Sequence, residues 1–215
     1  MKTKIILSLL VLFLLGGCNV LGQKDIAEMD PADLPDVIAF QDDFTREFMS
    51  SLEEVEAGYY LFESKTGGYT MMYPKNAKMN EIYYEMPGEA FEAIQFGEAE
   101  DTNEFQYFVR SIYESGSRGE DVDSLLGMLS EDANYNGKYQ NIELEDKTIH
   151  FATSEYVTKS GESISNLFFA LIMSNNSDQT VSIRYHAISN DDDKNIDLET
   201  IQNEAMKIME SIEFK

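Results

Sequence analysis

The sequence predicts an α+β fold, a three-layer α/β/α sandwich around a largely antiparallel central sheet. Residues 167–173 are seven consecutive apolar residues, and such a strand needs cover on both faces because a half-exposed strand alternates with polar residues. Polar turns at residues 159–162 and 175–178 flank this strand and favour antiparallel neighbours. Helical periodicity near both ends of the folded region supplies the covering helices.

The first element is an amphipathic helix predicted over residues 36–56. Its apolar residues recur at steps of three or four, and charged residues occupy the opposite side. Gly58 follows as a plausible helix stop. The apolar stripe consists of Val37, Phe40, Phe44, Phe48, Leu52 and Val55.

Short segments rich in aromatic and β-branched residues predict the strands of the sheet. They are residues 59–63, 69–73, 81–86, 92–97, 104–113, 142–144, 148–157, 163–174 and 180–189. Two further helices are predicted, over residues 121–129 and 197–212. Asp197 is a natural N-cap for the last helix, because its carboxylate can accept from the free backbone N–H groups of the first turn.

The N-terminal segment has the parts of a secretory signal. Lysines at positions 2 and 4 precede an apolar run at residues 5–15, and two glycines then lead to Cys18, the only cysteine in the chain. An apolar run this short does not favour a retained transmembrane helix, which needs about 20 residues. The alternative is an ordinary secretory signal in which Cys18 is incidental.

The sequence Leu15-Gly16-Gly17-Cys18 resembles the lipobox of bacterial lipoproteins. The resemblance implies that residues 1–17 are removed and that Cys18 receives a diacylglyceryl thioether, with fatty acyl chains such as palmitate as the anchor. Two or more chains give lasting attachment, whereas a single chain is marginal. The expected location is therefore the extracytoplasmic face of the cell membrane.

The remainder of the chain divides into an acidic tether at residues 18–35 and a single domain at residues 36–215. Polar, proline and glycine residues interrupt apolar periodicity in the tether. The domain comprises the helix at 36–56 and a sheet-containing core at 58–215. No disulfide can form within the chain, so its stability must come from packing.

The composition is strongly acidic. The whole chain has a formal net charge of −24, and removal of residues 1–17 takes away two lysines and no acid, which makes it −26. Nucleic acid and anionic lipid head groups would repel such a chain, so we expect no nucleic-acid partner and a membrane attachment through the lipid on Cys18. Solubility is the simplest role for the charge.

Two segments resemble the Mog1/PsbP-like superfamily. Residues 67–74 (GGYTMMYP) are similar to its opening strand pair, and residues 205–214 (AMKIMESIEF) to its final helix and terminal strand. The resemblance covers residues 58–215 and implies an α/β/α sandwich. It also implies a binding or assembly accessory rather than a catalyst, and it supplies no catalytic residues.

No catalytic or cofactor-binding motif is recognisable in the sequence. Nucleophile elbows, paired cysteines, zinc-binding helices and phosphate-binding glycine loops are missing. The two histidines, His150 and His186, fall within predicted strands, where packed or surface roles are commonest. We therefore expect no cofactor, and enzymatic activity stays an open question. The tyrosine pairs at 59–60 and 83–84 suggest an interaction surface, because adjacent strand residues face opposite ways.

One acidic segment has ligand-like spacing. Oxygen donors stand at alternate positions, a pattern that suits calcium. The candidate ligands are Asp191, Asp193, Asn195 and Asp197. However, Ile196 stands where a calcium-binding EF-hand loop has glycine, and Gln202 where it has glutamate. The competing interpretation is a solvated entry to the last helix.

Three functional hypotheses follow. The leading one is a membrane-anchored extracytoplasmic binding or accessory module of the cell envelope, with an envelope protein as a possible partner. The alternative is an envelope hydrolase that uses a pair of acidic residues, which requires two carboxylates about 5–9 Å apart in a cleft. The third is a spacer domain with a flat surface.

Overall fold

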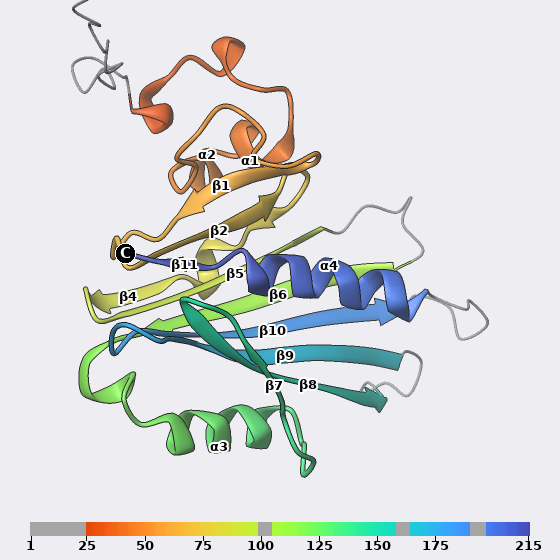
Figure 1. Ribbon diagram of the computed structural model, residues 1–215. Coiled ribbons are helices and arrows are strands. Elements are labelled where there is room, and N and C mark those ends of the chain that lie inside the picture. The colour runs from red at the N-terminus through yellow and green to blue at the C-terminus, as the bar shows by residue number, and fades with distance from the viewer. Residues whose placement is uncertain (1–24, 99–104, 158–163, 190–196) are drawn as a thin grey trace, which may run out of the picture.

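The computed structural model describes residues 25–98, 105–157, 164–189 and 197–215. Its centre is a large antiparallel sheet with strand order β3-β5-β6-β10-β9-β8-β7, and β4 pairs with β5 beside this path (Figure 1). The strands are β3 (Lys78–Met79), β4 (Glu85–Gly88), β5 (Phe91–Glu98), β6 (Phe105–Glu114), β7 (Gln140–Glu143), β8 (Lys147–Val157), β9 (Ile164–Ser174) and β10 (Thr180–Ser189).

A second, smaller sheet packs on one face of the large sheet. It has the order β1-β2-β11, built from β1 (Tyr59–Glu63), β2 (Tyr69–Pro74) and β11 (Glu213–Phe214). Aromatic rings join the two sheets: Tyr69 stacks on Tyr113 at 5.6 Å between centroids, and Tyr73 meets Phe96 at 4.7 Å. Helix α4 (Leu198–Glu210) lies beside the small sheet and contacts β2, β9 and β10.

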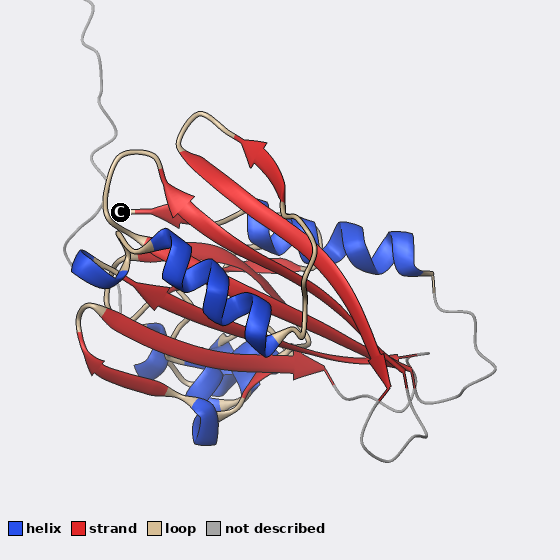
Figure 2. Ribbon diagram, turned by 90° about the horizontal axis from the view of Figure 1, so that it is seen from below, coloured by secondary structure: helices blue, strands red, loops and turns tan. Residues whose placement is uncertain are grey.

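The opposite face of the large sheet carries helix α3 (Val122–Asp132). Figure 2 shows α3 lying across the near face of the strands, with α4 behind them. The predicted three-layer arrangement is confirmed, with one difference: the layer that contains α4 is shared with the small sheet. The apolar strand β9 explains the arrangement, because Phe169 packs towards α3 while Phe168 and Ala170 belong to the core on the α4 side.

The predicted single helix over residues 36–56 is wrong. The chain forms two short helices instead, α1 (Ile38–Gln41) and α2 (Asp43–Arg46). Asp42 separates them, because its backbone is extended (φ −85°, ψ 120°) and its carboxylate accepts from the Thr45 N–H to cap α2. Beyond α2 the chain pairs with β1, where Ser50 N–H donates to the Leu61 carbonyl.

The predicted strand over residues 81–86 is wrong in its first half. Residues Glu81–Tyr83 form a 3₁₀ turn, η3, and only β4 is extended. The Asn80 side chain accepts a hydrogen bond from the Ile82 N–H, which satisfies a backbone donor locally and favours the turn. Ile82 is left 87% exposed.

Part of the predicted tether packs on the domain. Two 3₁₀ turns, η1 (Ile26–Glu28) and η2 (Pro31–Asp33), are capped by Asp25 and Asp30. Ile26 and Leu34 are buried in the main core, so residues from 25 onward are attached to the folded body. None of the helices in the described ranges is both long and apolar enough to cross a bilayer.

A buried carboxylate ties the two sheets together. Glu92 on β5 is fully buried, and it accepts hydrogen bonds from the Ser64 hydroxyl and the Lys65 N–H (3.0 Å), both in the turn that joins β1 to β2. Burial raises the pKa of Glu92, and these hydrogen bonds oppose the shift.

Candidate functional site

Helix α3 covers only part of its sheet face. Its apolar side packs on β8 and β9, in a cluster that includes Ala152, Leu167, Phe169 and Leu171. Beside the helix, over β5, β6 and β10, lies a hollow of about 500 Å³, which we call the α3 trough. A hollow of this size falls in the range of small-molecule sites.

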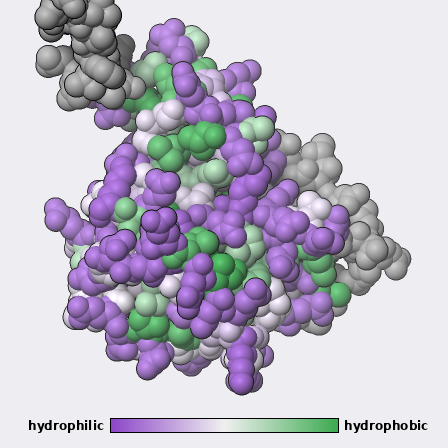
Figure 3. Space-filling model, in the orientation of Figure 1, coloured by the Kyte–Doolittle hydropathy of each residue, from purple (hydrophilic) through white to green (hydrophobic). Residues whose placement is uncertain are grey.

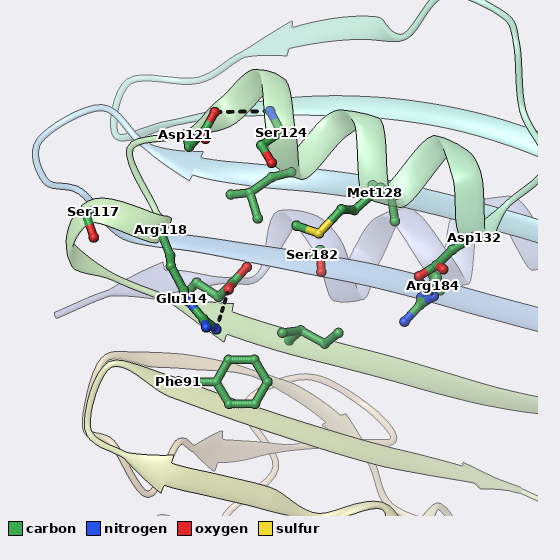
Figure 4. Close-up of a pocket in the computed structure, with 13 residues that line it drawn as sticks. Phe91, Glu114, Ser117, Arg118, Asp121, Ser124, Met128, Asp132, Ser182 and Arg184 are labelled. Atoms are coloured by element: carbon green, nitrogen blue, oxygen red, sulfur yellow. Dashed lines mark hydrogen bonds and ion pairs between the residues drawn. The ribbon is translucent and has the colours of Figure 1, made fainter.

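The middle of the α3 trough is apolar. Ile112 on β6 and Phe91 on β5 contribute to the sheet side, and Leu125, Met128 and Leu129 line the side formed by α3. Figure 4 shows Met128 pointing from the helix towards Ser182 on β10. Met128 remains 52% exposed.

An ion pair marks each end of the α3 trough. At one end, Arg118 lies 3.6 Å from the Glu114 carboxylate, and at the other end Arg184 pairs with Asp132 at the C-terminal end of α3 (Figure 4). Burial raises the pKa of Glu114, and the Arg118 charge opposes that shift. The trough therefore combines an apolar middle with charged ends.

A third arginine lies next to the α3 trough. Arg110 on β6 is directly opposite Arg184 on β10, so both side chains stand on the α3 face of the sheet. Arg110 donates to the Tyr83 carbonyl and pairs with Glu85 at 3.3 Å. Like charges directly opposite destabilise a sheet, and the two carboxylate partners offset that repulsion.

The same sheet face continues into an aromatic cluster. His186 on β10 stacks on Phe108 at 4.2 Å between centroids, and the Tyr156 hydroxyl lies 3.3 Å from His186 Nδ1. Burial lowers the pKa of His186 to about 4, and the Arg184 charge adds to the shift. His186 is therefore neutral at pH 7.

His150 on β8 also contacts side chains of the two neighbouring strands, β7 and β9. Its Nδ1 lies 2.8 Å from Asn141 Oδ1 and its Nε2 lies 3.2 Å from the Met173 sulfur. Burial lowers the pKa of His150. Both histidines thus make side-chain contacts on the sheet.

A smaller hollow on the α4 side brings two acids together. Glu98 and Glu204 line a space of about 160 Å³ together with three tyrosines, Tyr59, Tyr107 and Tyr185. Burial raises the pKa of Glu204, and the Glu98 charge adds to this effect. The hydrolase alternative stays a prediction, and this pair is one place where it can be tested.

Four of the predicted site residues lie outside the described ranges: Cys18, Asp191, Asp193 and Asn195. Asp197 is described, and it caps α4 as expected by accepting from the Thr200 N–H and hydroxyl. These hydrogen bonds lower the pKa of Asp197. Within the described residues no group of three or more histidine, cysteine or acidic side chains is placed to hold a metal ion.

The tyrosine pairs differ in exposure. Tyr60 is buried and Tyr59 half-buried, whereas Tyr83 is 49% exposed and Tyr84 packs against Phe48 at 5.4 Å. Hydrophilic side chains predominate on the face seen in Figure 3, and hydrophobic ones form small separate groups.

Sequence reasoning missed the α3 trough. Its signal was present in β10, where Ser182, Arg184 and His186 alternate with buried apolar neighbours. That alternation indicates a strand with one less-covered face. It does not reveal which side chains of β6 stand opposite, and this register creates the Arg110–Arg184 pair.

Comparison with known proteins identifies relatives. A family model described as "Putative lipoprotein YvcA" matches residues 35–213. A protein of the same description from Bacillus subtilis (strain 168) is 36% identical over 126 residues, which are 58% of this chain and 52% of the relative. The chain thus matches about half the length of that relative.

Two solved structures align with the chain at low similarity. A protein from Bacteroides thetaiotaomicron VPI-5482 has 13% identity and a TM-score of 0.40, over 72% of this chain and 48% of the other. LpqN of Mycobacterium tuberculosis, described as involved in cell envelope biogenesis, has 10% identity and a TM-score of 0.37, over 73% of this chain and 90% of the other. Similarity at this level carries no conclusion about function.

Proposed function

This chain belongs to the family described as "Putative lipoprotein YvcA", and we propose that it is a lipid-anchored binding or accessory module of the cell envelope. In this proposal, Cys18 carries the lipid, the domain lies on the extracytoplasmic face of the membrane, and the α3 trough is the binding surface. The observation that carries the binding role is the trough itself, an open hollow of about 500 Å³ with an apolar middle and charged ends.

The position of the first described residues supports the anchor. The described residues begin at Asp25, seven positions after Cys18, and seven residues can span at most about 25 Å. η1 lies at the end of the molecule opposite α3 (Figure 1), so an anchor there would leave the α3 trough facing away from the bilayer. The net charge of the mature chain favours the lipid as the attachment, since anionic head groups repel it.

Lipidation is tested at Cys18 directly. In cells supplied with labelled palmitate, we expect the wild-type chain to incorporate label and Cys18→Ala to incorporate none, because the thioether needs the thiol. Asn19→Ala, which changes the adjacent residue, should be labelled like the wild type. An unlabelled wild-type chain would support the ordinary secretory signal instead.

Binding at the α3 trough is tested by site-specific photo-crosslinking in cells that contain the anchored chain. A benzoylphenylalanine residue replaces Met128 in one variant and Val55 in a control, since these side chains are 52% and 47% exposed. We expect a discrete adduct from position 128 that is reduced when Ile112→Asp places a charge in the middle of the trough. Equal adducts from both positions, or none from position 128, would contradict the binding role.

A further inference from the structure

We propose that the α3 trough binds a single-chain anionic amphiphile, a molecule with one carboxylate or phosphate head group and one hydrocarbon chain. The inference rests on the proposed function, because it names the ligand class of the same trough. It depends on three observations: where the arginines gather, how their partners are exposed, and what lines the hollow between them.

The arginines are concentrated on one face of an acidic molecule. The chain has 40 acidic residues and only four arginines, Arg46 and three others. Arg118 and Arg184 line the α3 trough, and Arg110 stands directly opposite Arg184 on the neighbouring strand. Guanidinium groups match carboxylates and phosphates in a bidentate geometry. The trough is also lined by three acids, Glu114, Asp121 and Asp132, so an anion reaches a guanidinium group there by displacing a carboxylate.

The partners of these arginines are easily replaced. The side chains of Arg184 and Arg110 are only 20% and 16% exposed, whereas their partners Asp132 and Glu85 are 55% and 63% exposed. The guanidinium groups thus lie low on the sheet, while the carboxylates reach them from solvent-exposed positions. Because Asp132 is more than half exposed, it can leave Arg184 and be solvated by water, so an incoming head group can take its place on Arg184.

The hollow between the charged ends suits a hydrocarbon chain. Ile112, Leu125 and Met128 present apolar atoms along the α3 trough, and Met128 is half exposed. Burial of a chain against these side chains removes apolar surface from water on both partners. The head group then fixes orientation and the chain supplies affinity.

A single molecule fits better than a lipid surface. The mature chain has a formal charge of −26, which repels an anionic bilayer as a whole. The arginines also lie within or beside a hollow. The flat surface of a bilayer cannot enter the hollow to reach their partly buried side chains. An individual amphiphile has only one or two charges, so it is repelled far less than a charged bilayer, and its head group is small enough to enter the hollow.

The test uses the mature chain, residues 18–215, with Cys18→Ser, and calorimetric titration below the micelle-forming concentration of each probe. Dodecanoate and dodecyl phosphate are the charged probes, dodecanol is the uncharged probe, and acetate and inorganic phosphate are the head groups alone. We expect a charged probe to bind and dodecanol to bind at least about tenfold more weakly, since a charge-assisted hydrogen bond is lost. Preference for dodecanoate would indicate a fatty acid source, and preference for dodecyl phosphate a lipid head-group source.

Variants place the site. Arg184→Gln and Arg110→Gln should each weaken binding of the preferred probe by about tenfold, while Lys75→Gln, an exposed cation outside the trough, should leave it unchanged. If Arg184→Gln does not fold, two measurements still test the proposal. They are the affinity of Arg110→Gln for the preferred probe and the comparison of dodecanol with the charged probes on the chain that keeps all its arginines. Equal binding of dodecanol and dodecanoate, equal binding by both arginine variants and the wild type, or no binding of either charged probe would overturn the proposal. A specific adduct at position 128 in cells together with no amphiphile binding would overturn this inference and leave the proposed function standing.

Discussion

Replacing Phe169 with alanine is expected to lower the free energy of unfolding by about 3–5 kcal/mol, the usual range for removing a buried aromatic ring. Phe169 is fully buried beneath α3. The rings of Tyr135 and Tyr139 meet its ring edge-on at 5.3 Å and 5.8 Å between centroids. The variant would leave a cavity between the sheet and the segment that holds α3 in place, and would therefore also loosen the α3 trough.

Urea denaturation at pH 7 measures this effect. Ile82→Ala is a suitable control, because Ile82 is 87% exposed and its removal should change stability by no more than about 0.5 kcal/mol. Phe169→Leu should fall between the two. A loss of less than 1 kcal/mol for Phe169→Ala would mean that α3 is not packed on β9 as described.

His186 is expected to make stability depend on pH between 6.5 and 4. Its pKa is lowered from 6.5 to about 4 by burial and then by the Arg184 charge, so the folded state disfavours the protonated ring. As pH falls below 6.5 the unfolded chain takes up a proton that the folded chain does not. The stability contribution is therefore present above pH 6.5 and is lost as pH falls towards 4, and its size is about 3 kcal/mol.

The comparison of His186→Phe with the wild type isolates this contribution. Phenylalanine keeps a ring against Phe108 and cannot titrate, while all other acids and bases titrate alike in both proteins. We expect the stability of the variant relative to the wild type to rise by about 2 kcal/mol when urea denaturation is repeated at pH 4.5 instead of pH 7. A difference in stability that is the same at both pH values would show that His186 does not have a lowered pKa.

Local patterns were sufficient for most of the fold. β1 and β10 begin and end at the residues predicted from composition and turns, and the last helix begins after its predicted cap, Asp197. The helix predicted from residue 121 begins one residue later, because Asp121 is its cap. These features depend on residues close together in sequence: side-chain caps, polar turns and apolar periodicity. The apolar run of β9 also predicted cover on both faces, because a strand whose successive residues are all apolar has apolar side chains on both sides.

The failures came from competition between local patterns and distant partners. Residues 36–56 have a helical spacing of apolar residues, yet Asp42 caps a new helix in the middle and the following segment pairs with β1. The apolar positions Phe40 and Phe48 are buried as the periodicity suggested. The burial of these side chains was therefore predictable, but the type of secondary structure was not. The edge of β1 supplied hydrogen-bond partners for backbone groups that would otherwise have paired within a helix.

The sequence by itself predicted the sandwich of helices around an antiparallel sheet and the Asp197 cap of the last helix. It also contains the acidic composition and the lipobox-like residues that end at Cys18, and each of these is a property of neighbouring residues or of composition. Only the tertiary structure decided that α3 covers part of its sheet face, that Arg110 and Arg184 stand side by side, and that an apolar hollow runs between ion pairs. The physical reason is that strand register and helix placement join residues far apart in the sequence, such as Arg110 and Arg184, which are 74 positions apart. The spacing of residues along the sequence does not indicate which distant residues will be neighbours in the fold.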